Sequence, residues 1–272
     1  MEVSASKVLL VSKHHKEQII APILSSIGIE IEVIENFDTD QFGTFAGEIP
    51  RIEGPKITVK EKCLQGLAHS NMRIGLASEG SFGAHPFVPF LKANEEWLCY
   101  IDLDRQIEIY AKSLATEISD DLLTSKDKDQ LVAFLSKYDF PHQGMVFRDL
   151  TQNKIIQKGI QDKEVLYKLV SQFSNWQIET DLRAHQNPVR RKNIALAAQD
   201  LVKRLTSLCP QCAHPDFSIK GFCGQLDCEW CGQATSSYRY QVYACDQCQH
   251  SEEIMRNDKK VEDPQYCQNC NP

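Results

Sequence analysis

Eight of the eleven cysteines stand in pairs with two residues between the partners. Two thiolates at this spacing can bind one tetrahedral zinc ion, and four sulfurs complete a closed structural site. Eight paired thiolates therefore predict two structural zinc ions. The expected ligands come from CPQC, CEWC, CDQC and CQNC: Cys209, Cys212, Cys228, Cys231, Cys245, Cys248, Cys267 and Cys270.

The order in which the pairs combine is open. Fifteen residues separate the first two pairs and eighteen the last two, which favours sequential pairing, with interleaved pairing as the alternative. The segment YACDQCQHSEEIMRNDKKVEDPQYCQNCNP resembles the zinc-ribbon or rubredoxin-like pattern of knuckle, strand, turn and second knuckle. Disulfides or redox iron are the other chemistries that such cysteines allow.

A second candidate for chemistry is ETDLRAHQNPVRRKN, residues 179–193. Alternation of Asp181, Arg183 and His185 suggests one face of an extended segment. Asn187 followed by proline predicts an N-cap and the first residue of a helix.

Three cations follow that helix start: Arg190, Arg191 and Lys192. Cations in a first turn oppose the helix dipole, which favours anions there. They either lie on a solvated face or approach an anion such as phosphate. We favour the anion site, in which Arg183 and Arg190 contact the phosphate and Asp181 orients His185 or Arg183.

Polar residues of the amino-terminal half gather in segments expected to follow strands, where α/β proteins place ligands. Lys13 and Lys16 follow the first expected strand and are candidate phosphate contacts. Glu79, in the expected loop SEGSFGAHP, is a candidate magnesium ligand. Asp38 and Asp40 are candidates for activating water.

These residues require an α/β scaffold. KVLLVS predicts a buried strand, HHKEQIIAPILSSIG a helix closed by Gly28, and IEIEVI a second strand. Strands alternating with helices predict a layered α/β domain with a mixed sheet over residues 1–206. A small zinc-ribbon domain is expected over residues 207–272.

Charge and hydropathy narrow the class of protein. The formal net charge is −7, which argues against general nucleic-acid or membrane-surface binding. From Ser207 onward five Lys/Arg face nine Asp/Glu, so the ribbon suits a protein partner better than phosphate. No segment is apolar enough for a membrane span or a signal peptide, so a cytoplasmic location is expected.

Two resemblances add to these predictions. The combination of FDTDQFGTFAGEIPR, GLASEGSFGAHP, NEEW, ETDLRAHQNP and the CxxC array resembles a family of bacterial proteins catalogued as a domain of unknown function. The match covers nearly the whole chain and implies no activity.

The order of strand, basic loop, helix, strand and acidic glycine segment is similar to the inosine/xanthosine triphosphate pyrophosphatases, over residues 7–110 and 178–205. That resemblance implies magnesium-dependent hydrolysis of non-standard nucleoside triphosphates. Ser12 and Lys16 match the family's Ser/Thr-x-Asn-x-x-Lys loop, whereas His14 replaces its asparagine. The family's acidic metal ligand falls on Glu79, and its late basic motif near His185 and Arg190.

The leading hypothesis is a metal-dependent phosphohydrolase or nucleotide-binding protein with zinc, magnesium and a phosphate-bearing small molecule as partners. The main alternative is a non-catalytic zinc-binding adaptor that contacts a protein. RNA binding through the basic segment 183–204 is a third possibility.

Overall fold

The computed structural model describes residues 6–13, 15–38, 53–124 and 127–272. The chain divides into two compact units, Met1–Val202 (unit 1) and Lys203–Pro272 (unit 2). The predicted mixed α/β fold is confirmed. Within the described residues, no helix combines the length and the apolar character that crossing a bilayer requires.

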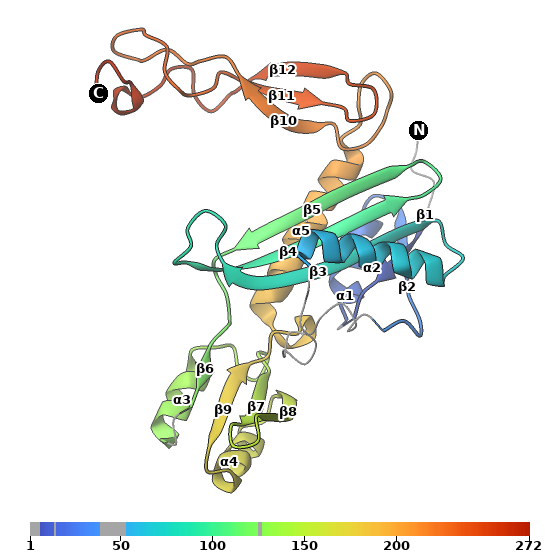
Figure 1. The fold of residues 1–272 in the computed structure, drawn as a ribbon, viewed down its shortest axis with the longest axis vertical. Helices are drawn as coiled ribbons and strands as arrows, with labels where there is room; N and C mark the ends of the chain where they lie inside the picture. The colour runs from blue at the N-terminus through green and yellow to red at the C-terminus, as the bar shows by residue number, and fades with distance from the viewer. Residues whose placement is uncertain (1–5, 14, 39–52, 125–126) are drawn as a thin grey trace. The chain divides into compact units, whose positions relative to one another are not determined.

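Unit 1 is built on a five-stranded mixed sheet with the order β2-β1-β3-β4-β5. Its three amino-terminal strands are parallel, and β4 and β5 continue as antiparallel neighbours. The parallel strands are joined through helices α1 and α2, as crossover connections require (Figure 1). The bounds are β1 (Ser6–Val11), α1 (Glu17–Ser25), β2 (Ile29–Val33), α2 (Pro55–His69), β3 (Ile74–Ala84), β4 (Lys92–Asp102) and β5 (Ile107–Ala115).

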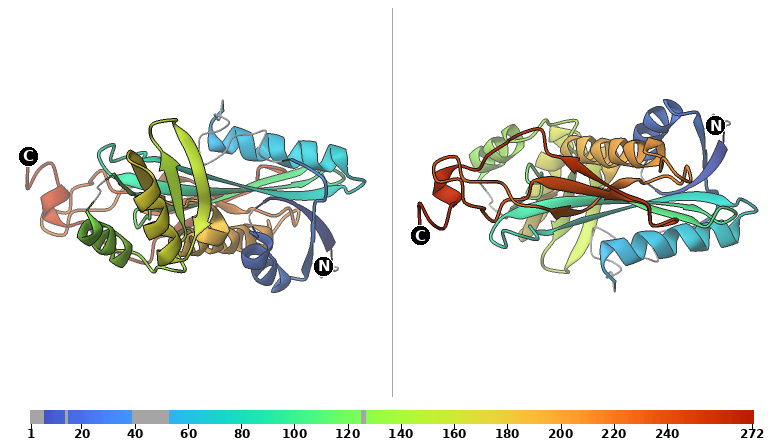
Figure 2. Two further views of the ribbon diagram at one scale, coloured as in Figure 1. Left: turned by 90° about the horizontal axis from the view of Figure 1, so that it is seen from below. Right: turned by 90° about the horizontal axis from the view of Figure 1, so that it is seen from above.

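Helices cover both faces of this sheet. Helix α2 lies on one face, and α1 lies on the other together with α5 (Pro188–Thr206) (Figure 2). Consequently β1 is buried on both sides, and Val8 to Val11 are all at most 3% exposed. Under α2, Val59, Cys63 and Leu67 pack against the strands.

The remainder of unit 1 forms a second, antiparallel sheet with the order β6-β9-β7-β8. Helices α3 and α4 supply Leu131, Phe134, Leu166 and Leu169 to a core shared with the strands. The bounds are β6 (Leu122–Leu123), α3 (Lys128–Ser136), β7 (Met145–Asp149), β8 (Lys154–Ile160), α4 (Lys163–Gln172) and β9 (Trp176–Thr180). Strands β7 and β8 thus form a hairpin that is flanked along the chain by α3 and α4.

Unit 2 contains a three-stranded antiparallel sheet, β10-β11-β12. Its apolar core is small, with Phe217 against Cys209 and Cys245, so the cysteines themselves are core residues. The bounds are β10 (Ser218–Cys223), β11 (Tyr240–Ala244), β12 (Ser251–Met255) and a short 3₁₀ helix, Pro264–Tyr266.

The expected ligand loop SEGSFGAHP is a strand instead, because β3 continues to Ala84. Its neighbour β4 includes Asn94 to Glu96. Glu79 pairs with Trp97 across this ladder. Position 80 of this strand requires glycine, because a Cβ on Gly80 would collide with the buried side chains of Arg190 and Glu96.

The chain before α5 also differs from the expectation. Strand β9 ends at Thr180, and residues Ala184–Gln186 form a 3₁₀ turn. Asp181, Arg183 and His185 therefore do not share one strand face. The side chain of Arg183 instead folds back onto Asp181, two residues earlier, which ends the extended path.

Candidate functional site

The eight paired cysteines form two groups of four sulfurs. In each group the Sγ atoms all lie within 4.8 Å of one another. The Cys209–Cys248, Cys212–Cys245 and Cys231–Cys267 sulfurs are 3.6 Å apart, and the Cys228–Cys270 sulfurs 3.8 Å. Tetrahedral zinc with bonds of about 2.3 Å places its sulfurs roughly 3.8 Å apart, whereas a disulfide needs about 2 Å. Both groups fit a closed four-thiolate metal site.

The turns around these cysteines repeat one local geometry. The backbone N–H four residues after the first cysteine donates to that cysteine's carbonyl in each pair, as Ala213 does to Cys209 at 2.8 Å. Ala213, Gly232 and Gln249 follow the second cysteine of their pairs in the left-handed region, with φ of 58°, 70° and 62°. Such compact turns direct both sulfurs of a pair to one side, as a chelating pair must.

The pairing is interleaved, so the favoured sequential order is wrong. The first CxxC pair joins the third, and the second joins the fourth. Strand order explains this: Ser218 of β10 pairs with Ala244 of β11. The pair before β10 and the pair after β11 therefore meet at the same end of the hairpin. The second pair lies between these strands, at the opposite end, and meets the carboxyl-terminal pair there.

Unit 1 contains a buried cluster of charges centred on Glu96. The Nε of Arg190 donates to Glu96 Oε1 at 2.6 Å, and the Nζ of Lys16 lies 3.5 Å from Oε2. Glu96 and Arg190 are both 1% exposed, and Lys16 is 4% exposed. Asn94 adds an amide donor to Glu96, and Ser78 accepts from Lys16 at 2.9 Å. This cluster joins α1, β3, β4 and α5.

The cluster shifts the ionisation of its members. Burial lowers the pKa of Lys16 to about 8, against the opposing attraction of Glu96. Burial raises the pKa of Glu96, but Arg190 and Lys16 outweigh burial and hold that pKa below its usual value. One carboxylate thus serves two buried cations at neutral pH.

Arg190 is consequently neither a solvated surface residue nor directed at solvent. Besides Glu96, its Nη1 donates to the Leu182 carbonyl at 2.6 Å. Asn187 accepts from the Arg190 backbone N–H at 2.9 Å and is the N-cap of α5, as its sequence predicts. Arg190 therefore anchors the first turn of α5 to the sheet. Its expected role as a phosphate contact stays a prediction.

The expected acidic residues lie in ion pairs. Lys62 pairs with Glu79, and Lys13 pairs with Asp38. Asp181 is 2% exposed and accepts from Arg183 through both of its oxygens. Lys16 donates to the Ser78 hydroxyl at 2.9 Å, and Lys62, the partner of Glu79, donates to the Ser78 carbonyl at 3.3 Å. His14 and Asp40 lie outside the described residues.

These pairs do not make a magnesium site. Among the described residues, the two cysteine groups are the metal-competent clusters of three or more ligands. Glu79, the expected magnesium ligand, is held by Lys62 rather than by converging carboxylates. The described residues therefore give no support to the expected magnesium site.

Next to Arg190, Arg191 has a different environment. It is half-buried and lines a cavity of about 400 Å³ together with Asp139, His142, Gln161, His185 and Pro188. Within the described part of the chain, the guanidinium of Arg191 has no hydrogen-bond or ion-pair partner. His142 contacts Asp139 at 3.3 Å, and the ring of His185 meets His15 edge-on with centroids 5.5 Å apart. We call this space the α5 cavity.

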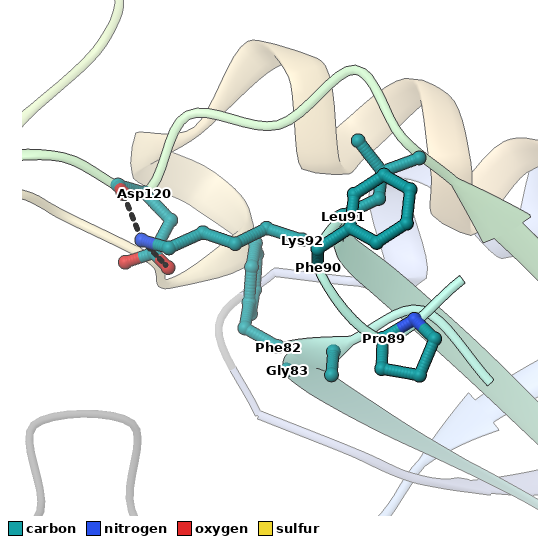
Figure 3. A pocket seen from close by; sticks show the side chains of 8 residues that line it. Phe82, Gly83, Pro89, Phe90, Leu91, Lys92 and Asp120 are labelled. Atoms are coloured by element: carbon teal, nitrogen blue, oxygen red, sulfur yellow. Dashed lines mark hydrogen bonds and ion pairs between the residues drawn. The ribbon is translucent and has the colours of Figure 1, made fainter. Parts of the chain in front are cut away.

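A second cavity, of about 260 Å³, lies on the β3–β4 hairpin. Figure 3 shows Phe82, Pro89 and Phe90 around it, with Lys92 reaching Asp120 along one side. The Nζ of Lys92 donates to the Asp120 carboxylate at 3.1 Å. We call this space the hairpin cavity.

Sequence reasoning missed several of these residues. The Asn-Glu-Glu context of Glu96 does not distinguish a buried carboxylate from exposed ones. His142 precedes β7, Gln161 follows β8, and neither residue carries a local signal. Arg191 was noticed only as one of three cations. Helical geometry separates Arg190 from Arg191 by about 100°, which could have indicated that only one of them faces the sheet.

Comparison with known families accounts for most of the chain. No curated protein matches the sequence. Residues 62–272 match a family described as a domain of unknown function, DUF6671, which spans the α5 helix and all four CxxC pairs. The similarity to the inosine/xanthosine triphosphate pyrophosphatases gains no support from these findings and stays a prediction. The chain belongs to the DUF6671 family.

Proposed function

We propose that unit 1 binds a phosphate-bearing small molecule in the α5 cavity. The observation that supports this most directly is Arg191, a half-buried cation in the first turn of a 19-residue helix, lining an open cavity. A cation there opposes the helix dipole, and Arg191 forms no ion pair with a carboxylate of the described residues, although Asp139 lines the same cavity. A phosphate would accept hydrogen bonds from its guanidinium, often in bidentate geometry.

The buried charge cluster holds in place the backbone that carries this site. Arg190 fixes the start of α5 to β4 through Glu96, and Asp181 fixes the preceding turn through Arg183. Arg191 and His185 are therefore presented on a rigid backbone. Preorganised donors lose little freedom on binding, which favours recognition of a small ligand.

A thermal-shift panel tests the proposal. Inorganic pyrophosphate, tripolyphosphate and the nucleoside mono-, di- and triphosphates would be added with and without magnesium. Ligand at a hundredfold excess over its Kd stabilises by about 2.7 kcal/mol, or roughly 5–11 °C for a unit of this size. No shift with any of these compounds would contradict the proposal. Release of inorganic phosphate in the same samples would distinguish a phosphohydrolase from a binding protein.

We further propose that unit 2 holds two structural zinc ions. The donor set is four thiolates in each group, the sulfurs are spaced for a tetrahedral ion, and the apolar core is too small to fold alone. Elemental analysis of protein purified without chelator should give two zinc ions per chain. Another metal, or fewer ions, would contradict this assignment.

A second candidate function, a protein-contact module, is favoured by the exposed aromatic side chains of unit 2. Trp230 is 78% exposed and Tyr266 59% exposed, and Trp230 lies inside the CEWC turn. Trp and Tyr are enriched at the centres of protein interfaces. Photo-crosslinking from position 230 should give one discrete adduct if this function is correct. Labelling indistinguishable from that at an exposed polar position such as Gln268 would argue against it.

A further inference from the structure

We propose that the hairpin cavity binds the planar ring of an aromatic heterocycle, the chemical class of the nucleobases. The inference deepens the proposed function by naming the ligand a nucleotide, and it rests on that function for the phosphate alone. Eight residues line the cavity: Phe82, Gly83, Ala84, Pro89, Phe90, Leu91, Lys92 and Asp120. Their chemistry, their rigidity and their position each favour a flat ligand with a polar edge.

The walls are aromatic and apolar, and those at the hairpin tip are exposed. Phe90 is 93% exposed, and Leu91 is 40% exposed. Figure 3 shows the rings of Phe82 and Phe90 on different sides of the space, one from strand β3 and the other from the hairpin tip. Aromatic side chains held apart in water provide stacking surfaces for a planar ring, because every base has a π-face.

Backbone hydrogen bonds and prolines constrain the hairpin tip, although its side chains are largely exposed. The N–H of His85 donates to the Leu91 carbonyl at 2.7 Å, and the N–H of Leu91 donates to the Val88 carbonyl at 2.9 Å. Pro86 and Pro89 fix two further φ angles in the same turn. The exposed ring of Phe90 is therefore on a constrained backbone, so binding a ligand against it requires little ordering.

One side of the cavity is polar and can exchange partners. Lys92 donates to both the carboxylate and the carbonyl of Asp120 at 3.1 Å. The side chains are 65% and 35% exposed, and an ion pair this accessible contributes little stability. A heterocycle has ring acceptors for the ammonium and amino donors for the carboxylate. A purely hydrocarbon ligand would satisfy neither, which favours a nucleobase over a lipid chain.

Two contacts also link the lining of the hairpin cavity to the start of α5. The guanidinium of Arg190 lies over the Phe82 ring, 5.9 Å from its centroid. The side-chain amide of Asn187 donates to the carbonyl of Ser119, the residue before Asp120, at 3.3 Å. Two walls of the hairpin cavity are thus positioned by the same helix turn that presents Arg191 to the α5 cavity.

Saturation-transfer NMR with adenosine, guanosine, cytidine and uridine tests the ring site without any phosphate. Phe90→Ala removes one stacking wall, and Gly83→Val narrows the cavity by adding a side chain to its lining. The fold should accept this valine, because a Cβ at Gly83 meets no atom within 4 Å. Phe87→Ala is the matched control, because Phe87 lies on the same tip, is 84% exposed and does not line the cavity.

At least one nucleoside should bind the full-length protein and the Phe87→Ala variant equally. Phe90→Ala should weaken it by at least about tenfold, as expected for the loss of one base–aromatic stack, and Gly83→Val should weaken it as well. Tripolyphosphate binding should be the same in all four proteins. Binding of no nucleoside, or equal losses in Phe87→Ala and Phe90→Ala, would overturn the ring site. Failure of tripolyphosphate alone to bind would instead overturn the phosphate site.

Discussion

Glu96→Gln should destabilise unit 1 more than Arg190→Met does. Both side chains are 1% exposed, and removing one partner of a buried ion pair costs about 3–5 kcal/mol. The glutamine variant leaves Lys16 and Arg190 facing a neutral amide, so its cost should lie at the upper end. The methionine variant leaves Glu96 with Lys16 at 3.5 Å, so its cost should lie at the lower end.

Circular dichroism thermal melts of the zinc-loaded protein measure this difference. For a unit of roughly 200 residues, 3–5 kcal/mol corresponds to a fall in Tm of about 6–20 °C. Arg73→Met is the control, because Arg73 pairs with Asp104 in an exposed ion pair and should shift Tm by at most about 2 °C. If Glu96→Gln were no more destabilising than Arg190→Met, one carboxylate would not be serving two cations, and the reasoning would be refuted.

Two further predictions concern protonation and metal pairing. Unfolded lysine keeps its proton to about pH 10.5, whereas Lys16 in the folded protein loses its proton near pH 8. Between these values the unfolded state therefore binds more protons than the folded state. The free energy of unfolding should rise with pH over this range, by about 3 kcal/mol in total. Urea melts at pH 7.5 and 9.5 should show about 2 kcal/mol of that rise in the wild type relative to Lys16→Met, and an unchanged difference would contradict the lowered pKa. Interleaved pairing predicts one zinc ion per chain in the double variant Cys209→Ser/Cys245→Ser and none in Cys209→Ser/Cys228→Ser; elemental analysis giving the opposite result would favour sequential sites.

Much of the fold could be predicted from local signals. Helix α5 begins at Pro188, as Asn187 and the proline that follows it predict. Gly28, with φ of 78°, closes the first helical segment as expected. These features depend on neighbouring residues alone, which is why a single sequence suffices for them.

The errors arose where distant segments decide the structure. Gly80 and its neighbours resemble a loop, but they form a strand because Arg190 packs against them from α5. The interleaved zinc sites follow from the register of β10 on β11, which spacing between cysteines does not encode. In the same way, Arg190 and Arg191 look alike in sequence, and the position of Glu96 on β4 decides which of them is the buried anchor.

Arg191, rather than its neighbouring cations, is the residue that we propose binds a phosphate at the start of α5. Isothermal titration of the wild type, Arg191→Ala and Lys192→Ala with inorganic tripolyphosphate tests it most directly. Lys192 is the matched control, since it is an exposed cation in the same turn and does not line the α5 cavity. A hydrogen bond to a charged group is worth about 1.5–3 kcal/mol, so Arg191→Ala should weaken binding by roughly 10- to 150-fold, with Lys192→Ala within about threefold of wild type. Equal losses in the two variants, or unchanged affinity in Arg191→Ala, would contradict the claim.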